Sequence, residues 1–478
     1  MPASKIYSSG LETQLSYRSL RLGACLLVSF SMAQSPALIA QQQDTPAKAH
    51  DISITAVPAP LGGTSPQLLP TSQGEVHNVL RGGLTLGALY DDNAVIANTQ
   101  GSEYQYSISP SLALQQTRPH TAWSLDYRGG FTIEHTPLET GVSVQNATSA
   151  TADLQHLFSP RLLLELREDY LRTNVLFGYT TETQSVSALS GPGQLNSFIA
   201  IPAATRTVDV STGNLTYQLT QHSSMGFSGS YSIQRFRDVA VAPGVALSLI
   251  DTRTATGRGF YALEISRRNK IGFEYQLQDL RFQGNIARTV DQTIFAFEEI
   301  ALTNSMTLTL YGGPDRTHAH NNILLLGSNQ STSVVPMVND NLSPAGGAMF
   351  TLRGKFVALR LSGQRIVTDG SGSTGAVRST NASAEFRRDF TNRWNLGLRY
   401  LYSDGRLLVD AANAGNSRIT FHQGSLILER RLSERLVVRG LYTRLQQESA
   451  GTPAALTTGN HNRVAVELAY QFARPVGR

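Results

Sequence analysis

Apolar and polar residues alternate in repeated segments from about residue 79 to the end of the chain. In the clearest segment, every second residue from Trp123 to Ile133 is apolar or glycine, and the residues between them are polar or small. Successive side chains of a strand point to opposite faces of a sheet, so this pattern predicts a strand with one apolar and one polar face. The last segment, Arg463 to Phe472, repeats the pattern.

About eighteen such segments can be counted, with sixteen as the alternative. They start near residues 79, 104, 121, 146, 161, 206, 224, 254, 270, 288, 305, 343, 354, 377, 393, 418, 435 and 462. Tight connections such as TRPH, FSPR and LSER follow the even segments, and longer ones follow most odd segments. Two of the longer connections, near 175–205 and 314–342, reach about thirty residues. Short turns on one rim and long loops on the other are typical of outer-membrane barrels.

The sequence therefore predicts an all-β protein, a closed antiparallel transmembrane barrel formed by residues 78–478. Every backbone polar group in a bilayer must be paired within the protein, so a sheet there must close on itself. The apolar face would contact lipid and the polar face would line the lumen. An even number of strands places both ends of the barrel at the periplasmic rim. A soluble β-propeller is the alternative fold, but it needs polar outward faces, which the segment from Trp123 to Ile133 does not supply.

Composition excludes several other classes of protein. The 478 residues are 41% hydrophobic and 16% charged, with one cysteine and a formal net charge of +5. A disordered chain would have fewer apolar residues and a higher net charge, and a disulfide scaffold would have many cysteines. A helical membrane protein would contain apolar runs of about 18 residues or more, which this chain lacks.

The amino terminus has the form of a secretory signal peptide, predicted over residues 1–40. Arg18 and Arg21 precede an apolar run of about eleven residues, which is too short to span a bilayer. We favour cleavage near Ala40, with a site after Ala33 as the alternative. Cys25 lies before most of the apolar run, so we interpret it as part of the signal rather than as a lipidated amino terminus.

Residues 41–77 are rich in Pro and Gln and lack a sustained period, which predicts a disordered periplasmic linker. Removal of residues 1–40 lowers the formal net charge from +5 to +3. This charge is small and dispersed, so no nucleic-acid partner is expected.

Two stretches resemble a known family. The sequence GLTLGALYDDNAVI (83–96) resembles the start of Gram-negative outer-membrane β-barrel porins, of the kind that accompanies exopolysaccharide or exosortase systems. The end of the chain, HNRVAVELAYQFARPVGR, is similar to the closing strand that the barrel assembly machinery recognises through aromatic residues, here Tyr470 and Phe472. The resemblance implies an outer-membrane location, contact with outer-membrane lipid and a channel, with polysaccharide-export components as further partners. It implies no particular solute.

Charged residues of both signs occupy the polar face and are candidates for lining the lumen. They are Asp126, Arg128, Glu134, Arg167, Glu264, Glu274, Arg360, Glu385, Arg387, Arg399 and Glu467, with Glu165, Asp169 and Arg463 on the same face. Rows of opposite charge can select solutes in a pore. They can also pair across neighbouring strands and brace the wall. The pattern leaves both interpretations open.

Catalytic and metal chemistry have little support in the sequence. The ten histidines are scattered, and His120 and His222 fall in predicted periplasmic turns, so no catalytic His and Ser pair is evident. His318 and His320 could point the same way, but we interpret their segment as a solvated loop because a third metal ligand is missing. No cofactor is expected.

Three functions follow, in order of preference. The first is a passive or substrate-selective channel for small hydrophilic solutes. The second is a structural part of exopolysaccharide export or cell-envelope assembly, and the third is an outer-membrane barrel hydrolase.

Overall fold

The computed structural model describes residues 78–92, 102–135, 142–173, 205–237, 250–326, 332–369, 375–408, 418–450 and 459–475. The predicted signal peptide, the predicted linker and the first long connection, up to residue 204, lie outside them. No helix in the described part of the chain is long and apolar enough to cross a membrane.

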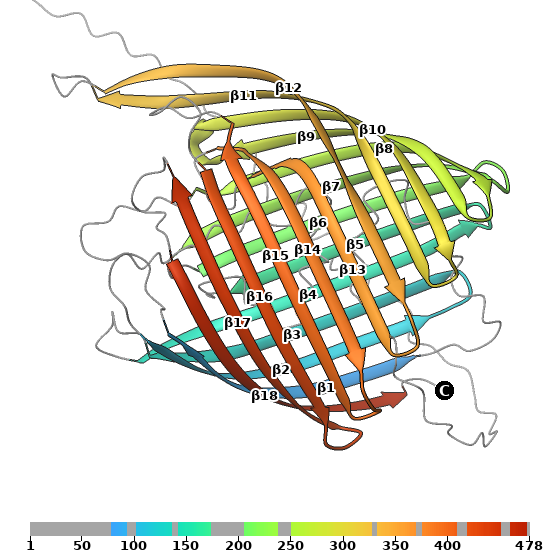
Figure 1. The fold of residues 1–478 in the computed structure, drawn as a ribbon, viewed down its shortest axis with the longest axis vertical. Coiled ribbons are helices and arrows are strands. Elements are labelled where there is room, and N and C mark those ends of the chain that lie inside the picture. Colours follow the sequence, from blue (N-terminus) through green and yellow to red (C-terminus); the bar gives the residue numbers. More distant parts are fainter. Residues whose placement is uncertain are drawn as a thin grey trace, which may run out of the picture. The chain divides into compact units, whose positions relative to one another are not determined.

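Eighteen antiparallel strands and one short 3-10 helix make up the described residues. The elements are β1 (Val79–Asp91), β2 (Glu103–Thr117), β3 (Thr121–His135), β4 (Val142–Ser159), β5 (Leu162–Thr173), β6 (Thr205–Gln218), β7 (Ser223–Arg237), β8 (Thr252–Ser266), β9 (Asn269–Phe282), η1 (Gln283–Asn285), β10 (Ala287–Thr303), β11 (Met306–Leu326), β12 (Thr332–Arg353), β13 (Val357–Thr368), β14 (Val377–Asp389), β15 (Trp394–Leu407), β16 (Arg418–Arg431), β17 (Leu436–Ala450) and β18 (Gly459–Pro475). Each strand pairs with the next in sequence, and β18 pairs with β1. The sheet is therefore a closed barrel (Figure 1).

The predicted number of eighteen strands is confirmed. The predicted starts agree with the observed ones to within three residues except at β4 and β12. The eight tight connections that follow the even strands are also present, so the two ends of the barrel and all these turns share one rim. Five of them are closed by backbone hydrogen bonds between the residues that flank the turn, as between Gly354 and Val357.

The connection predicted near 314–342 is wrong for most of its length. Residues 315–326 of β11 pair with residues 332–343 of β12, which starts about ten residues earlier than expected. His318 and His320 consequently lie in a strand, not in a loop. The strand was missed because polar residues occupy both of its faces here, as Thr317 and His318 show, so the alternation of apolar and polar residues disappears.

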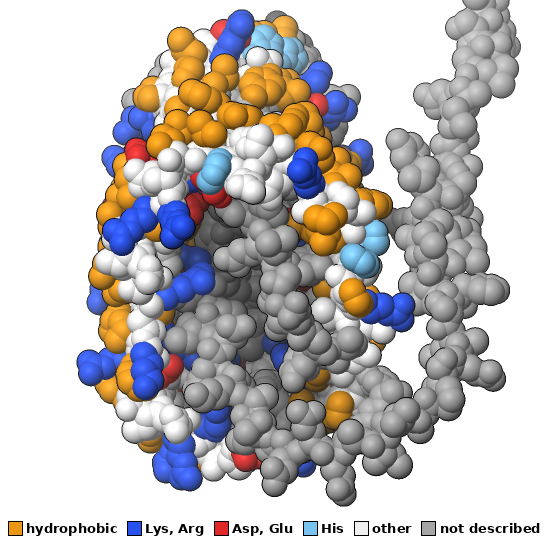
Figure 2. All heavy atoms as spheres, turned by 90° about the vertical axis from the view of Figure 1, so that its right-hand side faces the viewer, with side chains coloured by type: hydrophobic (Ala, Val, Ile, Leu, Met, Phe, Trp, Pro, Cys, Tyr) orange, Lys and Arg blue, Asp and Glu red, His pale blue; other side chains and the backbone are white. Residues whose placement is uncertain are grey.

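The outer wall is apolar and the inner wall is polar. Leu125, Tyr127, Phe131 and Ile133 alternate along β3 and are all exposed on one face, Phe131 to 61%. Figure 2 shows one end of the barrel, where hydrophobic side chains spread over the outer wall and charged side chains edge a hollow. An exposed apolar belt around a closed sheet is favourable in a bilayer, because in solution the whole apolar surface would be exposed to water.

At the rim of the long connections, parts of the wall approach one another. The pairing of β12 with β13 begins at Gly346, which has a φ of +156°. Residues 332–345 of β12 extend beyond this pairing toward the rim of the long connections. Asn339 of β12 donates a hydrogen bond to the Leu408 carbonyl after β15, with a distance of 2.8 Å. Thr252 of β8 donates to Asp369, just after β13, with a distance of 3.1 Å. The ends of β8 and β12 therefore contact the ends of β13 and β15.

A small apolar core supports this contact between strand ends. Buried side chains from β9 and β10 pack with buried side chains just before β8, at the end of β13 and just before β14. The cluster contains Ile250, Leu280, Phe282, Ala287, Val367 and Ala376. Burial of such side chains contributes about 1.5 to 3 kcal/mol for each large one, so the described strand ends form a packed junction.

Candidate functional site

The inner wall carries the predicted lumen residues. Their strand positions alternate with the exposed apolar positions of the outer wall, so they lie on the opposite face. These residues are Asp126, Arg128, Arg167, Glu264, Glu274, Arg360, Glu385, Arg387, Arg399 and Glu467. Glu134 lies near the end of β3, and its side chain is outside the described ones.

One charged group spans β3, β4 and β5. Arg167 bonds to Asp169 with a distance of 2.7 Å from Nε to Oδ2, and its Nη1 lies 3.5 Å from Oδ1 of Asp153. Thr151 donates a further hydrogen bond to Asp169, with a distance of 2.9 Å. Asp126 lies opposite Thr151 in the register and is exposed on the inner wall. Arg167 is therefore held by two carboxylates beside an acid that water can reach.

A second charged group spans β14 to β18. Arg439 lies between two carboxylates, with its Nη2 3.0 Å from Glu429 and its Nη1 3.1 Å from Glu467. The Arg399 Nε lies 3.3 Å from Oε1 of Glu385, directly across the strand pair. Arg439 and its partners are mostly buried, whereas the side chains of Arg399 and Glu385 are 32% and 31% exposed. The two cross-strand sites therefore differ in their access to water.

The two groups form one continuous strip along the inner wall. Arg128 on β3 interacts electrostatically with Glu467 and Arg439 on β18 and β17, although β1 and β2 lie between them. The inner positions of β1 and β2 are small on both register rows: Gly83 and Ser111 in line with Arg128, and Gly87 and Ser107 in line with Glu467. Long guanidinium side chains can therefore reach over β1 and β2. We call the charged residues of β3–β5 and β14–β18 the inner charge strip.

Toward the rim of the long connections, the seam between β18 and β1 holds a buried ionic group. The Arg463 Nε lies 2.5 Å from Oδ2 of Asp91, and the His461 Nδ1 lies 3.3 Å from Oδ1 of the same residue. All three side chains are almost fully buried. This group joins the two ends of the barrel sequence.

The wall from β7 to β12 has a different character. Phe295 and Phe297 point inward and pack with Ala262 and Ala345 in a buried apolar cluster, and the adjoining Tyr311 donates a hydrogen bond to Gln364. This wall also carries charged residues. The Arg258 Nε lies 3.9 Å from Glu274, and Glu264 is exposed at the end of β8 near the short turns. Asp291 on β10 and Asp315 on β11 are buried on the same wall. Charge is therefore present on both sides of the lumen.

Arg360 lies on β13 beside the inner charge strip, and Arg387 on β14 is part of it. Arg360 is buried and lies opposite Glu385 in the register. The Arg387 Nε lies 3.6 Å from Asp389 near the short turns. Glu385 therefore has an arginine opposite it on each neighbouring strand.

Sequence reasoning missed several charged residues of the inner wall. Asp153, Glu429 and Arg439 each alternate correctly with apolar neighbours, and that alternation is the signal that could have found them. The segments around β4 and the start of β17 have weak alternation, because small or apolar residues occupy both faces there. The ion pairs themselves depend on register between strands, which no single segment encodes.

The histidine pair on β11 does not form a metal site. His318 lies on the outer face, with its Nδ1 2.6 Å from Oδ1 of Asp340 on β12. Among the described residues, no group of three His, Cys, Asp or Glu side chains is placed to hold a metal ion.

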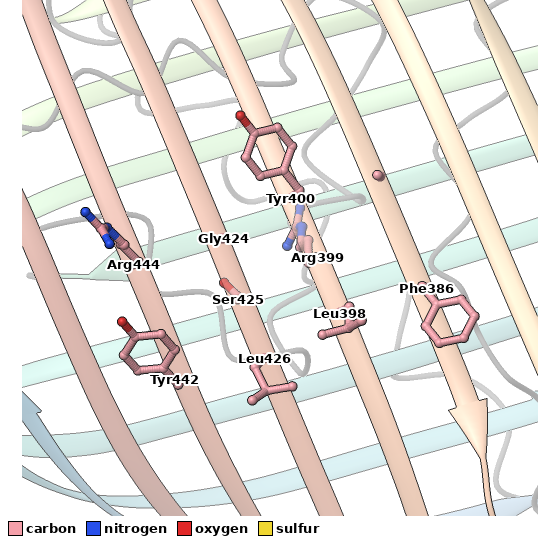
Figure 3. A pocket seen from close by; sticks show the side chains of 10 residues that line it. Phe386, Leu398, Arg399, Tyr400, Gly424, Ser425, Leu426, Tyr442 and Arg444 are labelled. Atoms are coloured by element: carbon pink, nitrogen blue, oxygen red, sulfur yellow. The ribbon is translucent and has the colours of Figure 1, made fainter.

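A depression on the outer wall surrounds Gly424, where no side chain fills the surface (Figure 3). Its edge is formed by Leu398, Tyr400, Tyr442 and Arg444, while the neighbouring Arg399 points behind the ribbon toward the inner wall. The depression faces the apolar belt and is therefore separate from the inner charge strip.

The sheet closes completely and has an apolar outer belt and a polar inner wall. These three features identify the architecture. This is a transmembrane barrel of the outer-membrane type. No protein-family model matches the chain, and no curated protein matches it.

Solved structures resemble the chain at low sequence identity. OpdL from Pseudomonas aeruginosa is 13% identical, with a TM-score of 0.39, over 83% of this chain and 99% of that one. OccAB3 from Acinetobacter baumannii is 12% identical, with the same TM-score and coverage. OpdK from Pseudomonas aeruginosa, solved with vanillate, is 11% identical over 83% of this chain and 99% of that one, also with a TM-score of 0.39.

Proposed function

We propose that this barrel is a channel for small hydrophilic solutes. The supporting observation is the pair Glu385 and Arg399, which faces inward and keeps about a third of each side chain accessible to water. Asp126 is exposed on the same wall. Barrels of 16 to 18 strands enclose an aqueous path unless a loop fills them. Charges that line such a path act on the solutes that pass.

The arrangement of charge supports selectivity as well as passage. Acidic and basic groups alternate from strand to strand along the inner charge strip. A solute in the lumen would experience the field of these charges and would turn its polar groups toward the strip. We therefore infer that the channel favours solutes that carry polar or charged groups.

Ion selectivity in planar bilayers tests this function. The double variant Arg128→Ser with Arg399→Ser should fold normally and shift the reversal potential in a salt gradient toward cations. The shift should shrink at high salt, because ions screen the lumen charges. Arg444→Ser removes the same charge from the outer wall and should leave selectivity unchanged. A folded protein that passes neither ions nor sugars would contradict the proposal.

A role in exopolysaccharide export is the second candidate. It is supported by the resemblance of residues 83–96 to porins that accompany such systems. In that case the segment 41–77 would contact partners in the periplasm. Deletion of residues 41–77 should then reduce export while the barrel still folds and conducts. Normal export after this deletion would count against the role.

A hydrolase has the weakest support. His422 bonds to Tyr400 on the outer face, with a distance of 2.8 Å, and His156 bonds to Thr121 near the short turns, also with 2.8 Å. Neither histidine faces the lumen or the rim of the long connections, where substrate from outside would arrive.

A further inference from the structure

Four basic side chains form a row on the outer face of β8 to β11. The register places Arg253 opposite Arg281, Arg281 opposite Arg288, and Arg288 opposite His320. Directly opposite residues of antiparallel strands point to the same face. Arg281 and Arg288 have side chains that are 62% and 56% exposed. We call these four residues the outer cation row.

The row faces away from the lumen. The positions next to it along the four strands are held by buried inward side chains, which are Thr252, Leu280, Thr289 and Ala319. Because neighbours along a strand alternate between faces, the outer cation row must project from the outer wall.

Like charges directly opposite each other destabilise a sheet, so such a row needs a counter-charge. Asp279, one outward position further along β9, partly supplies it. Its carboxylate lies 2.6 Å from Nη2 of Arg281 and 2.9 Å from Nε of Arg288. Arg253 and Arg316 are further exposed arginines on this surface, and Asp340 of β12, which pairs with His318, is a second acid on the same face. The four arginines therefore outnumber the two acids Asp279 and Asp340.

The row lies at the edge of the apolar belt. Toward the short turns, the next outward positions on β9 and β10 include Tyr275, Leu277 and Ile294, all exposed. Away from the short turns, the strands end at the opposite rim. A molecule that occupied the row and the surface beside it would therefore need an anionic head and an apolar body.

Outward basic residues occur near the same rim on other strands as well. Arg406 of β15 lies opposite Arg378 of β14 and Arg418 of β16, and Arg418 lies 2.6 Å from Asp404. On β1 and β2, the outward positions nearest this rim are Tyr90 and Tyr104, whose rings pack with centroids 5.0 Å apart. Cations at this rim are therefore grouped on particular strands, and the outer cation row is the group on β8 to β11.

We infer that the outer cation row binds the phosphate groups of a phosphorylated glycolipid in the outer leaflet. Arginine forms paired, charge-assisted hydrogen bonds with phosphate, and the exposed guanidinium groups of neighbouring strands can contact one headgroup together. The acyl chains would lie on the apolar surface next to Tyr275 and Ile294. Inorganic phosphate would bind the same arginines, but it has no apolar part that could contact the apolar belt.

Native mass spectrometry of the full chain, folded in neutral detergent, tests the inference. The probe is bisphosphorylated lipid A, compared with its phosphate-free analogue and with inorganic phosphate. The triple variant Arg253→Gln, Arg281→Gln and Arg288→Gln should bind the bisphosphorylated lipid about tenfold more weakly or worse. The double variant Arg388→Gln and Arg430→Gln is the matched control. These arginines lie on the outer wall near the short turns, over Phe390 and Trp394.

Thermal unfolding separates lost binding from lost folding. Without lipid, the triple variant should unfold at close to the wild-type temperature, because the loss of repulsion among the arginines offsets the loss of the exposed ion pairs with Asp279. With the bisphosphorylated lipid, the wild type and the control should gain stability and the triple variant should not. Equal binding of the phosphate-free lipid, equal competition by inorganic phosphate, or wild-type binding by the triple variant would each overturn the inference.

Discussion

Neighbouring residues of one strand face two different environments. On β3, Leu125 is exposed on the outer wall, whereas Ser124 donates a hydrogen bond to Asp153 on the inner wall, with a distance of 3.4 Å. Their sequence separation is a single residue, but the pleat turns them to opposite sides. The effect of a substitution should therefore depend on the face more than on the residue type.

Arginine substitutions on β3 should show this dependence. Leu125→Arg and Phe131→Arg should impair folding into lipid, because an arginine on the lipid face near the midplane costs about 2 to 4 kcal/mol. Ser124→Arg and Thr132→Arg place the same charge in the lumen and should be tolerated. Heat-modifiable migration on a denaturing gel measures the folded fraction. Equal damage by both pairs would mean that the faces are assigned the wrong way round.

The two arginine sites of the inner charge strip should respond differently to the loss of charge. Arg439→Ser leaves Glu429 and Glu467 mostly buried without their shared cation, which should cost about 3 kcal/mol of stability, near the lower end for a broken buried pair. Arg399→Ser exposes Glu385 to lumen water and should cost at most about 1 kcal/mol. Urea unfolding in detergent compares them. Similar losses would show that burial does not distinguish the sites.

The sequence could predict the faces of single residues but not their partners. The period of two was enough to place Asp126 and Arg128 on the inner wall. It could not show that Arg439 lies between carboxylates of two other strands, because that contact depends on how three strands align. Asp153 was overlooked for a different reason, because small or apolar residues occupy both faces around it on β4.

At the scale of elements, the tight turns were the most predictable feature and the β11–β12 hairpin the least. A segment that crosses lipid must alternate in hydrophobicity, whereas a strand beyond the bilayer can be polar on both faces. The hairpin also needs glycine where backbones approach closely. A Cβ on Gly313 would overlap the Ile294 carbonyl, and Gly346 has a positive φ. The alternation of apolar and polar residues does not indicate where the backbones approach closely or where a positive φ is needed.

The closing strand gives a prediction at this scale. Tyr470→Ala with Phe472→Ala should slow assembly and increase degradation, because β18 closes the sheet and presents these aromatic side chains outward. Gly82 lies opposite Phe472, whose ring covers it, so Gly82→Val should weaken the same pairing. Pulse-chase labelling with gel mobility measures both variants. Unchanged levels of folded protein in the aromatic variant would remove the proposed role in assembly.

At the scale of the whole barrel, the contact between distant strand ends deserves a direct test. Cysteines at positions 252 and 369 should form a disulfide under mild oxidation, because the side chains of Thr252 and Asp369 bond to each other although 117 residues separate them. Their reduced and oxidised forms should differ in gel mobility before heating. The pair at 252 and 441 is a control, because Leu441 lies on β17. Crosslinking of both pairs, or of neither, would contradict the observed contact.

The seam between β1 and β18 has a consequence for how the protein folds. Seventeen pairings join strands that follow each other in sequence, and each can form as a local hairpin. The last pairing joins Asp91 to Arg463, which are 372 residues apart, so it must close a very large loop. Loop-closure entropy and the slowness of long-range contacts make this step the late one. Once made, it is held by Asp91, Asp92, His461 and Arg463 across the seam. Opening the barrel then requires these polar contacts to break. The stability of the protein should therefore depend on the rate of unfolding rather than on the unfolding equilibrium.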